Sequence, residues 1–355
     1  MHREDGMTSN ERLSAFFEGK EVDHLPAMPF LDSIGCKAAG MTHKEKRSSA
    51  KNTAQAQIVC YERFGNDGMS IEYGLHGIGS ACGSVMSDPE NGVPAVMEHC
   101  LSDLDRLHEL DPECVSKKRD PWAKMHYEAM EICQEKWGHE VGVSVGVPGP
   151  YTAAASIYSI DRLLRATRKE PEKVHELLRF ATKAVKLVIR EFTDTGADIF
   201  LCDPIASASI INRKTYREFV LPYTRELADC IHEADAAFGY HICGDTTKIT
   251  ADMAEAGCDF LSVDNKVDLA VAKEIAGDQK PLIGNVDPVD VMMFGMETDV
   301  HDAIKACLKK AWDNPGGFII STGCDIPIDA PIENIDYFMK AVRTYAKYPL
   351  DPTRW

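Results

Sequence analysis

A histidine and a cysteine lie two positions apart in the run YHICGD, residues 240–245. Side chains two apart in a β-strand point to the same side, so an extended backbone aims His241 and Cys243 at one point. Cys324, in the run STGCD (321–325), ends a second apolar run and offers a third donor. One imidazole and two thiolates form a soft ligand set that favours tetrahedral Zn²⁺ with one open position. On spacing alone, a hydrogen-bonded core histidine is the simpler interpretation.

Short apolar runs in the second half of the chain have the length and composition of buried strands. Helical patterns separate them. Residues 171–192 place apolar side chains on one face, with Pro171 in the first turn and Gly196 as the stop. Residues 246–257 repeat this design, with a threonine cap at the start and Gly257 at the end. The predicted strands of this half are residues 197–204, 238–243, 259–265, 281–288 and 316–325.

Four further strands are predicted in the first half, at residues 25–30, 69–74, 94–99 and 141–150. Alternating strands and helices favour a parallel sheet, most simply a (β/α)8 TIM-type barrel. A doubly wound sheet is the alternative, but the sequence contains no glycine-rich phosphate fingerprint to support it. We therefore expect an N-terminal helical extension over residues 1–24 and a single catalytic barrel domain over residues 25–355.

Polar residues that end the predicted strands are candidates for an active site, because the site of such a barrel lies at the carboxyl ends of its strands. Asp203 and Asp264 are expected either to orient His241 or to cap loops. Asn285 is expected to bind substrate or to support its own turn. Tyr151 follows the run VPGP and is expected to line the mouth of the barrel. These four residues are the predicted substrate-binding set beside the metal ligands.

The composition excludes several classes of function. The chain has 355 residues, of which 39 are basic and 56 acidic, and its net charge of −17 disfavours nucleic acid as a partner. We find no apolar run long enough for a membrane span or a signal peptide. The 12 cysteines form no C-x-x-C pair and are scattered, which is typical of free thiols in a reducing compartment. These features predict a cytoplasmic enzyme.

Three runs resemble the methylcobamide:thiol (coenzyme M-type) methyltransferases of the uroporphyrinogen decarboxylase superfamily: residues 241–274, residues 282–288 (LIGNVDP) and residues 321–335 (STGCDIPIDAPIENI). Residues 10–30, 147–164 and 202–227 fit the same pattern, so the resemblance covers nearly the whole chain. It implies a uroporphyrinogen decarboxylase-like (β/α)8 barrel. It also implies that the family's H-x-C and distant C bind zinc here through His241, Cys243 and Cys324, which are then the catalytic residues.

The resemblance further implies methyl transfer between a methylcobamide, carried by a separate corrinoid (cobalamin-binding) protein, and a thiol such as coenzyme M, a reaction of one-carbon metabolism. A free thiol has a pKa near ~8.5 and is mostly protonated at neutral pH. Zinc would hold the substrate sulfur as a thiolate, and two cysteinates would keep that sulfur nucleophilic. Asp67 and Glu72 are candidates for a fourth zinc ligand when no thiol is bound.

Three alternatives remain at this point. A donor-side enzyme would demethylate a small methylated or methoxylated substrate onto the corrinoid protein. A uroporphyrinogen decarboxylase would need cationic partners for eight carboxylates, and the stretch after the first strand offers only Lys37; its catalytic aspartate would correspond to Asp67. A non-enzymatic zinc-binding module would need a fourth protein ligand. The residues leave open the methyl donor or acceptor, the direction of transfer, the corrinoid partner and formation of a homo-oligomer.

Overall fold

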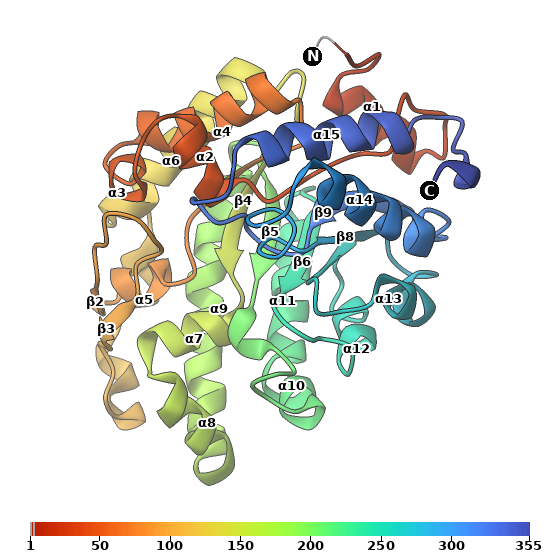
Figure 1. The fold of residues 1–355 in the computed structure, drawn as a ribbon. Helices are drawn as coiled ribbons and strands as arrows, with labels where there is room; N and C mark the ends of the chain where they lie inside the picture. Colours follow the sequence, from red (N-terminus) through yellow and green to blue (C-terminus); the bar gives the residue numbers. More distant parts are fainter. Residues whose placement is uncertain (1, 3) are drawn as a thin grey trace.

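Seven parallel strands form one curved sheet in the computed structural model, which describes residue 2 and residues 4–355 (Figure 1). The strands are β1 (Met69–Glu72), β4 (Val143–Pro148), β5 (Asp198–Cys202), β6 (Phe238–Ile242), β7 (Phe260–Val263), β8 (Leu282–Val286) and β9 (Phe318–Thr322). They lie side by side in this order, and every ladder between neighbours is parallel. Their carboxyl ends therefore meet at one rim.

The segment of residues 26–28 closes this sheet into a barrel. On one side it pairs with β9, where the backbone N–H of Ile320 donates to the carbonyl of Pro26 at 2.9 Å. On the other side Asp67, just before β1, donates its backbone N–H to the carbonyl of Ala27 at 2.8 Å. The segment thus acts as the eighth strand, and the predicted barrel fold is confirmed.

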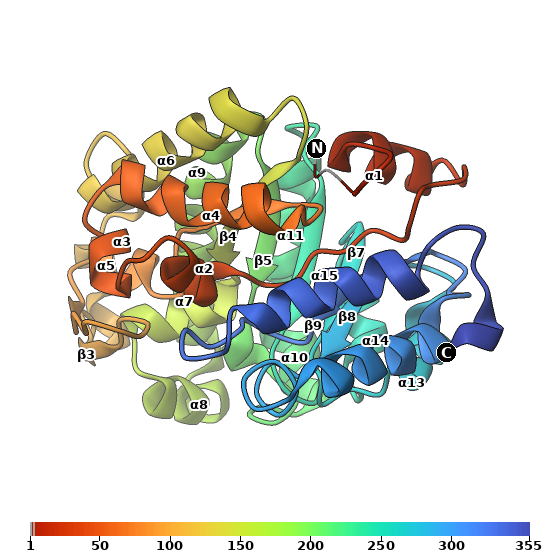
Figure 2. The same ribbon diagram turned by 45° about the horizontal axis from the view of Figure 1, so that its top comes forward.

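Helices lie outside the sheet and bury one apolar face against it (Figures 1 and 2). The longest of the described helices, α9 (Pro171–Thr193), has the predicted proline in its first turn and buries the predicted apolar stripe, which includes Val174, Leu177 and Val188. Among the described residues, no helix is long and apolar enough to cross a membrane. The other helices of the outer layer are α4 (Ala50–Phe64), α6 (Pro121–Trp137), α11 (Leu221–His232), α12 (Thr250–Ala254), α13 (Leu269–Ala276), α14 (Glu297–Ala311) and, after the last strand, α15 (Glu333–Tyr345).

Shorter elements follow the carboxyl ends of the strands and surround the mouth of the barrel. They are α2 (Asp32–Ala38), α3 (His43–Lys46), α5 (Gly77–Ala81), the hairpin of β2 (Val85–Met86) and β3 (Val96–Glu98), α7 (Pro150–Ile157), α8 (Ile160–Lys169) and α10 (Arg213–Phe219). At the amino terminus, α1 (Ser9–Phe17) precedes the closing segment. An N-terminal helix was expected there; a domain boundary after residue 24 stays a prediction.

The structure differs from two expectations about these elements. The predicted strand at residues 94–99 does form, as β3, but it pairs antiparallel with β2 outside the barrel and leaves Met97 66% exposed. The predicted helix over residues 246–257 begins only at Thr250, without a side-chain cap. Asp245 accepts hydrogen bonds from the backbone and hydroxyl of Thr247, and this local turn replaces the first helical turn.

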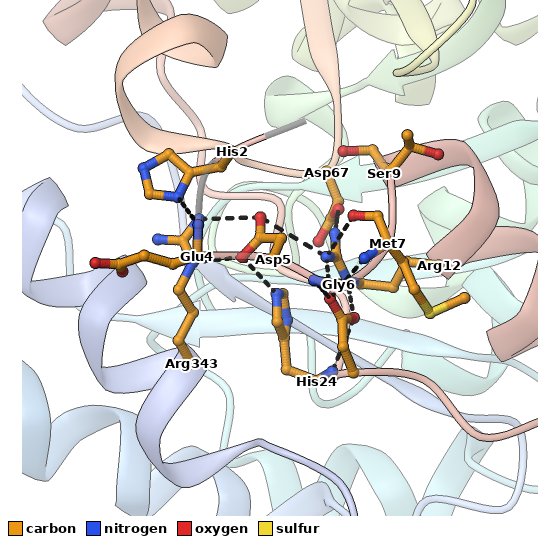
Figure 3. Close-up of polar contacts among 12 residues, drawn as sticks. His2, Glu4, Asp5, Gly6, Met7, Ser9, Arg12, His24, Asp67 and Arg343 are labelled. Atoms are coloured by element: carbon orange, nitrogen blue, oxygen red, sulfur yellow. Dashed lines mark hydrogen bonds and ion pairs between the residues drawn. The ribbon is translucent and has the colours of Figure 1, made fainter.

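An ion-pair network ties α1 to the closing segment (Figure 3). The guanidinium of Arg12, a fully buried side chain, donates to both carboxylate oxygens of Asp23, at 2.7 and 2.8 Å, and to Asp67. The other oxygen of Asp67 accepts the backbone N–H of Ala27 at 2.8 Å. Asp67 therefore belongs to the amino-terminal end of β1, and the suggestion that it binds zinc or acts as a catalytic aspartate is wrong.

Asp5, Asp23 and His24 also lie close enough to suggest a metal site, with one potential ligand atom each within 4.8 Å of the others. Two guanidinium groups already pair with the carboxylates of Asp5 and Asp23. Arg343 Nε lies 2.7 Å from Asp5, and Arg12 contacts both acids (Figure 3). A metal cation would have to displace them, so we interpret this group as part of the ion-pair network.

We predict that Arg12→Met destabilises the fold by about 3–5 kcal/mol, because it leaves the buried carboxylates of Asp23 and Asp67 without a counter-charge. The measurement is urea unfolding followed by circular dichroism. Arg106→Met is the matched control: Arg106 pairs with Glu109 on the surface, and its loss should cost only about 0–1 kcal/mol. Equal effects of the two substitutions would contradict the interpretation of the network.

The same network predicts a loss of stability in acid. Burial raises the pKa of Asp23, but the hydrogen bonds from Arg12 outweigh this effect and hold the pKa at about 2, below the ordinary value of 3.8. The stabilisation is therefore present above pH ~4 and is lost as the pH falls toward 2. Unfolding curves between these pH values should show a smaller decline in the Arg12→Met variant than in the wild type.

Candidate functional site

The carboxyl ends of β6 and β9 bring His241, Cys243 and Cys324 together. Cys243 Sγ lies 3.3 Å from His241 Nε2 and 3.8 Å from Cys324 Sγ. One potential ligand atom from each residue lies within 4.8 Å of the others. His241 is the penultimate residue of β6 and Cys243 directly follows the strand, so extended backbone directs both to one point. This cluster of one nitrogen and two sulfur donors can hold a soft metal ion.

The imidazole of His241 is fixed by contacts on two sides. It is 2% exposed, and its Nδ1 lies 3.0 Å from the hydroxyl of Ser262 in β7. The rings of Phe30 and Phe200 lie at centroid distances of 5.5 and 6.4 Å. When Nδ1 donates to Ser262, the lone pair of Nε2 faces the sulfur of Cys243. The sequence offered Asp203 and Asp264 either for this orienting role or as loop caps; in the structure the partner of Nδ1 is Ser262.

The two cysteines of the cluster share a proton. A hydrogen bond from Cys243 outweighs the effect of burial and, with a further contribution from His241, lowers the pKa of Cys324 to about 4. The same hydrogen bond and burial raise the pKa of Cys243 well above its ordinary value. The hydrogen bond therefore favours a pair in which one sulfur is a thiolate and the other keeps its proton. Metal binding to both sulfurs would release that proton.

A cavity of about 260 Å³ opens onto this cluster. All three residues line it, together with Cys202 at the end of β5. Its volume suits a small substrate, since sites for drug-sized ligands measure ~300–1,000 Å³. Apolar and aromatic side chains make up much of its wall, among them Phe30, Leu31, Leu75, Trp122, Phe200 and Ile283.

A buried glutamate from the end of β1 lines the same cavity. Burial, with a smaller effect of Asp32, raises the pKa of Glu72 to about 7, although the Ser70 hydroxyl donates to its carboxylate at 2.7 Å. Gly146 in the neighbouring strand β4 leaves the space that this side chain fills, because a Cβ there would overlap the carboxylate of Glu72. Glu72 was named only as a possible fourth ligand, and its place in the cavity keeps that role open.

A second acid, Asp325, directly follows Cys324 and lines the same cavity. Its carboxylate accepts the backbone N–H groups of Asp32 and Ser33 at 3.0 and 3.2 Å, at the start of α2. Burial, and then the charge of Asp32, raise the pKa of Asp325 to about 8. Sequence reasoning missed this residue, although it directly follows Cys324 and so had to lie at the same rim.

Tyr151 and Asp203 were predicted to bind substrate, but the described residues that line the cavity do not include them. The buried carboxylate of Asp203 accepts the backbone N–H groups of Tyr151 and Thr152 at 3.3 and 2.8 Å and also the hydroxyl of Thr152. It thereby caps the amino-terminal end of α7. A Cβ on Gly149 would overlap this carboxylate, so a glycine at this position leaves room for Asp203 to cap the helix.

Asp264 and Asn285 likewise do not belong to the described lining of the cavity. The carboxylate of Asp264 accepts the backbone N–H of Gly244 at 2.8 Å and so holds the turn that follows Cys243. Asn285 Nδ2 donates to the carbonyls of Asp264 and Val267 at 2.9 and 2.7 Å. These bonds hold the loops next to the cluster of His241, Cys243 and Cys324. Substrate binding by Asp264 and Asn285, as by Tyr151 and Asp203, stays a prediction.

Comparison with known proteins places this geometry in a family context. The family model described as uroporphyrinogen decarboxylase (URO-D) matches residues 8–345. The methylcobamide:CoM methyltransferases MtbA of Methanosarcina acetivorans and MtaA of Methanosarcina barkeri are 26% and 27% identical, each over 95% of this chain and 98% of the relative. A solved structure of a methyltransferase from Methanosarcina mazei matches with a TM-score of 0.82 at 25% identity, over 95% of this chain and 98% of that one. The resemblance read from the sequence is confirmed.

We predict that Asp203→Ala lowers the free energy of unfolding by about 1–3 kcal/mol, because it removes the acceptor of three buried donors at the start of α7. The measurement is denaturant unfolding. Asp103→Ala is the control: this exposed aspartate caps a surface turn of residues 104–109, and its loss should cost less. Unchanged stability with a raised KM for the substrate would contradict the capping role and favour substrate binding.

Proposed function

Because the chain belongs to the uroporphyrinogen decarboxylase family, we propose that it is a zinc-dependent corrinoid methyltransferase with a thiol as the methyl acceptor. The observation that carries the proposal is the cluster of His241, Cys243 and Cys324 at the wall of a small cavity. Two relatives that match 95% of the chain are named methylcobamide:CoM methyltransferases, which supports a corrinoid protein as the partner that brings or removes the methyl group.

The donor set of the cluster fits zinc. One imidazole nitrogen and two cysteine sulfurs are typical ligands of Zn²⁺, and three protein ligands are the number found in catalytic zinc sites. The described residues bring no fourth histidine, cysteine or carboxylate atom into the cluster. Zinc held by His241, Cys243 and Cys324 would bind the substrate sulfur at its fourth position and keep it as a thiolate.

The surrounding residues prepare the site for this chemistry. Ser262 fixes the ring of His241, and Asp264 fixes the turn after Cys243, so both ligands are held before substrate arrives. The carboxyl group of Glu72, with its pKa raised to about 7, can hold a proton within the cavity at neutral pH. The apolar wall excludes water from the substrate sulfur. With a methylcobamide as the methyl donor, that sulfur would attack the methyl carbon, so that the C–S bond forms while the Co–C bond breaks and its electron pair leaves with the corrinoid.

Two of the alternative functions fit the site less well. A structural zinc site would be closed by a fourth protein ligand, whereas this cluster faces a cavity. Uroporphyrinogen carries eight carboxylates and needs cationic partners. Apart from histidines, Lys46 and Arg47 are the basic residues in the described lining, and each is paired with an aspartate.

We predict that the purified protein contains about one zinc per chain. Cys243→Ala and Cys324→Ala should each reduce zinc content severalfold after dialysis, because each removes one of three ligands. The measurement is elemental analysis by mass spectrometry. Cys202→Ala is the matched control, since Cys202 lines the same cavity outside the cluster and should leave zinc content unchanged. Full zinc content in the Cys243 and Cys324 variants would place the metal elsewhere.

We also predict thiol-dependent consumption of methylcobalamin by the zinc-loaded enzyme, measured by the change of its visible spectrum. Both cysteine variants should lose most of this activity, by a factor of ~100 or more, because the acceptor would remain a protonated thiol. Cys230→Ala, a substitution in α11 away from the cavity, should retain it. Zinc-loaded protein that transfers no methyl group to any thiol, but demethylates methoxylated compounds onto a corrinoid protein, would support the donor-side alternative.

A further inference from the structure

Each basic side chain in the described wall of the cavity, histidines aside, already contacts a carboxylate. Lys46 is 8% exposed, and its ammonium group contacts the carboxylate of Asp32. Arg47 is 13% exposed and pairs at 3.1 Å with Asp88, a carboxylate that also pairs with Lys44 at 2.7 Å. The second terminal nitrogen of Arg47 donates to the carbonyl of Gly92 at 3.0 Å. Apart from histidines, the described lining contains no further basic residue. An anion in the cavity would therefore have to compete with a carboxylate for each cation.

The two histidines away from the metal cluster add no positive charge. His43 Nδ1 accepts the backbone N–H of Gly92 at 3.1 Å, so this nitrogen carries no proton. His126 lies 2.8 Å from the carbonyl of Trp122 through Nδ1, and burial lowers its pKa to about 4. Both rings are neutral at pH 7, so neither can serve as the counter-ion of an anionic substrate.

Three carboxyl groups line the same cavity: Asp32, Glu72 and Asp325. Asp32 balances Lys46, whereas Glu72 receives a hydrogen bond from the neutral Ser70 and Asp325 receives backbone N–H groups. In the described structure neither Glu72 nor Asp325 forms an ion pair with a basic residue. Three carboxyl groups and two basic side chains thus share the described lining, beside a wall that is largely apolar.

From this arrangement we infer that the methyl acceptor is a thiol whose body carries no negative charge, so that the enzyme discriminates against sulfonated and carboxylated thiols. The inference rests on the proposed thiol methyltransferase function. A sulfonate is ionised at every physiological pH and loses its hydration when it is buried. This loss is offset by cations, and both cations of the described wall already contact a carboxylate. A neutral body such as an alkyl or hydroxyalkyl group finds apolar contacts instead.

Three two-carbon thiols of similar size test the inference: 2-mercaptoethanol, 2-mercaptoethanesulfonate and cysteamine. With zinc-loaded full-length enzyme and methylcobalamin, kcat/KM should be about tenfold or more higher for 2-mercaptoethanol than for the sulfonate, which corresponds to ~1.4 kcal/mol or more. Affinity measured by isothermal titration calorimetry, without methylcobalamin, should show the same order. Cysteamine should bind at least as well as the sulfonate.

Two substitutions test whether charge is the cause. Asp32→Asn releases Lys46, and Glu72→Gln removes an uncompensated acid, so each should raise the relative affinity for the sulfonate severalfold. Asp111→Asn is the matched control, because Asp111 pairs with Arg119 on the surface, outside the cavity. Thermal unfolding of each variant verifies that it folds. Glu72→Gln, which keeps the size of the side chain, carries the test where Asp32→Asn does not fold.

The outcomes distinguish a failure of the inference on specificity from a failure of the proposed methyltransferase function. Methyl transfer that is fastest to the sulfonate would overturn the inference and leave the proposed function intact. Preference for the neutral thiol with unchanged ratios in both folded variants would also overturn it, since charge would not be the cause. No methyl transfer to any thiol, with zinc bound, would overturn the proposed function and the inference together. Preference for the neutral thiol that weakens in both variants supports both.

Discussion

The rest of the barrel depends on the interactions of one buried carboxylate, that of Asp67. It binds the guanidinium of Arg12 from α1 and the backbone of Ala27 from the closing segment, while its own backbone N–H bonds the same residue. The segment of residues 26–28 makes few ladder bonds of its own, so this ion pair replaces part of what a regular strand would supply. Without closure the ends of β1 and β9 would separate, and the rim would not converge.

Closure also explains how distant residues reach one site. β6 and β9 are not neighbours, since β7 and β8 lie between them. Cys324 lies just beyond its strand and meets Cys243 across the curved rim. Ser262, on the intervening strand β7, contacts the far side of the imidazole of His241. The cluster of His241, Cys243 and Cys324 therefore follows from the curvature of the sheet as well as from the identity of its residues.

The sequence predicted the barrel because buried parallel strands leave continuous apolar runs, and helices such as α9 leave a clear stripe. It placed His241 and Cys243 together because their spacing is local. Cys324 ends another predicted strand and was therefore expected at the same rim, but no local rule links it to β6, and the family resemblance was needed to favour a metal site over a core histidine. The roles of Asp203 and Asp264 could not be decided from sequence, because an aspartate at a strand end serves a helix cap, a turn or a ligand equally well. Ser262 and Asp325 acquire their roles only through contacts across the rim.

The fit between Glu72 and Gly146 has a consequence for how this site can change during evolution. Gly146 in β4 leaves the space that the carboxylate of Glu72, from β1, occupies. A lineage that gained any side chain at position 146 first would displace the glutamate, whereas one that first shortened the residue at position 72 would leave a void that position 146 could then fill. The overlap therefore constrains the order of substitutions at these two positions, which are far apart in the chain but sterically coupled.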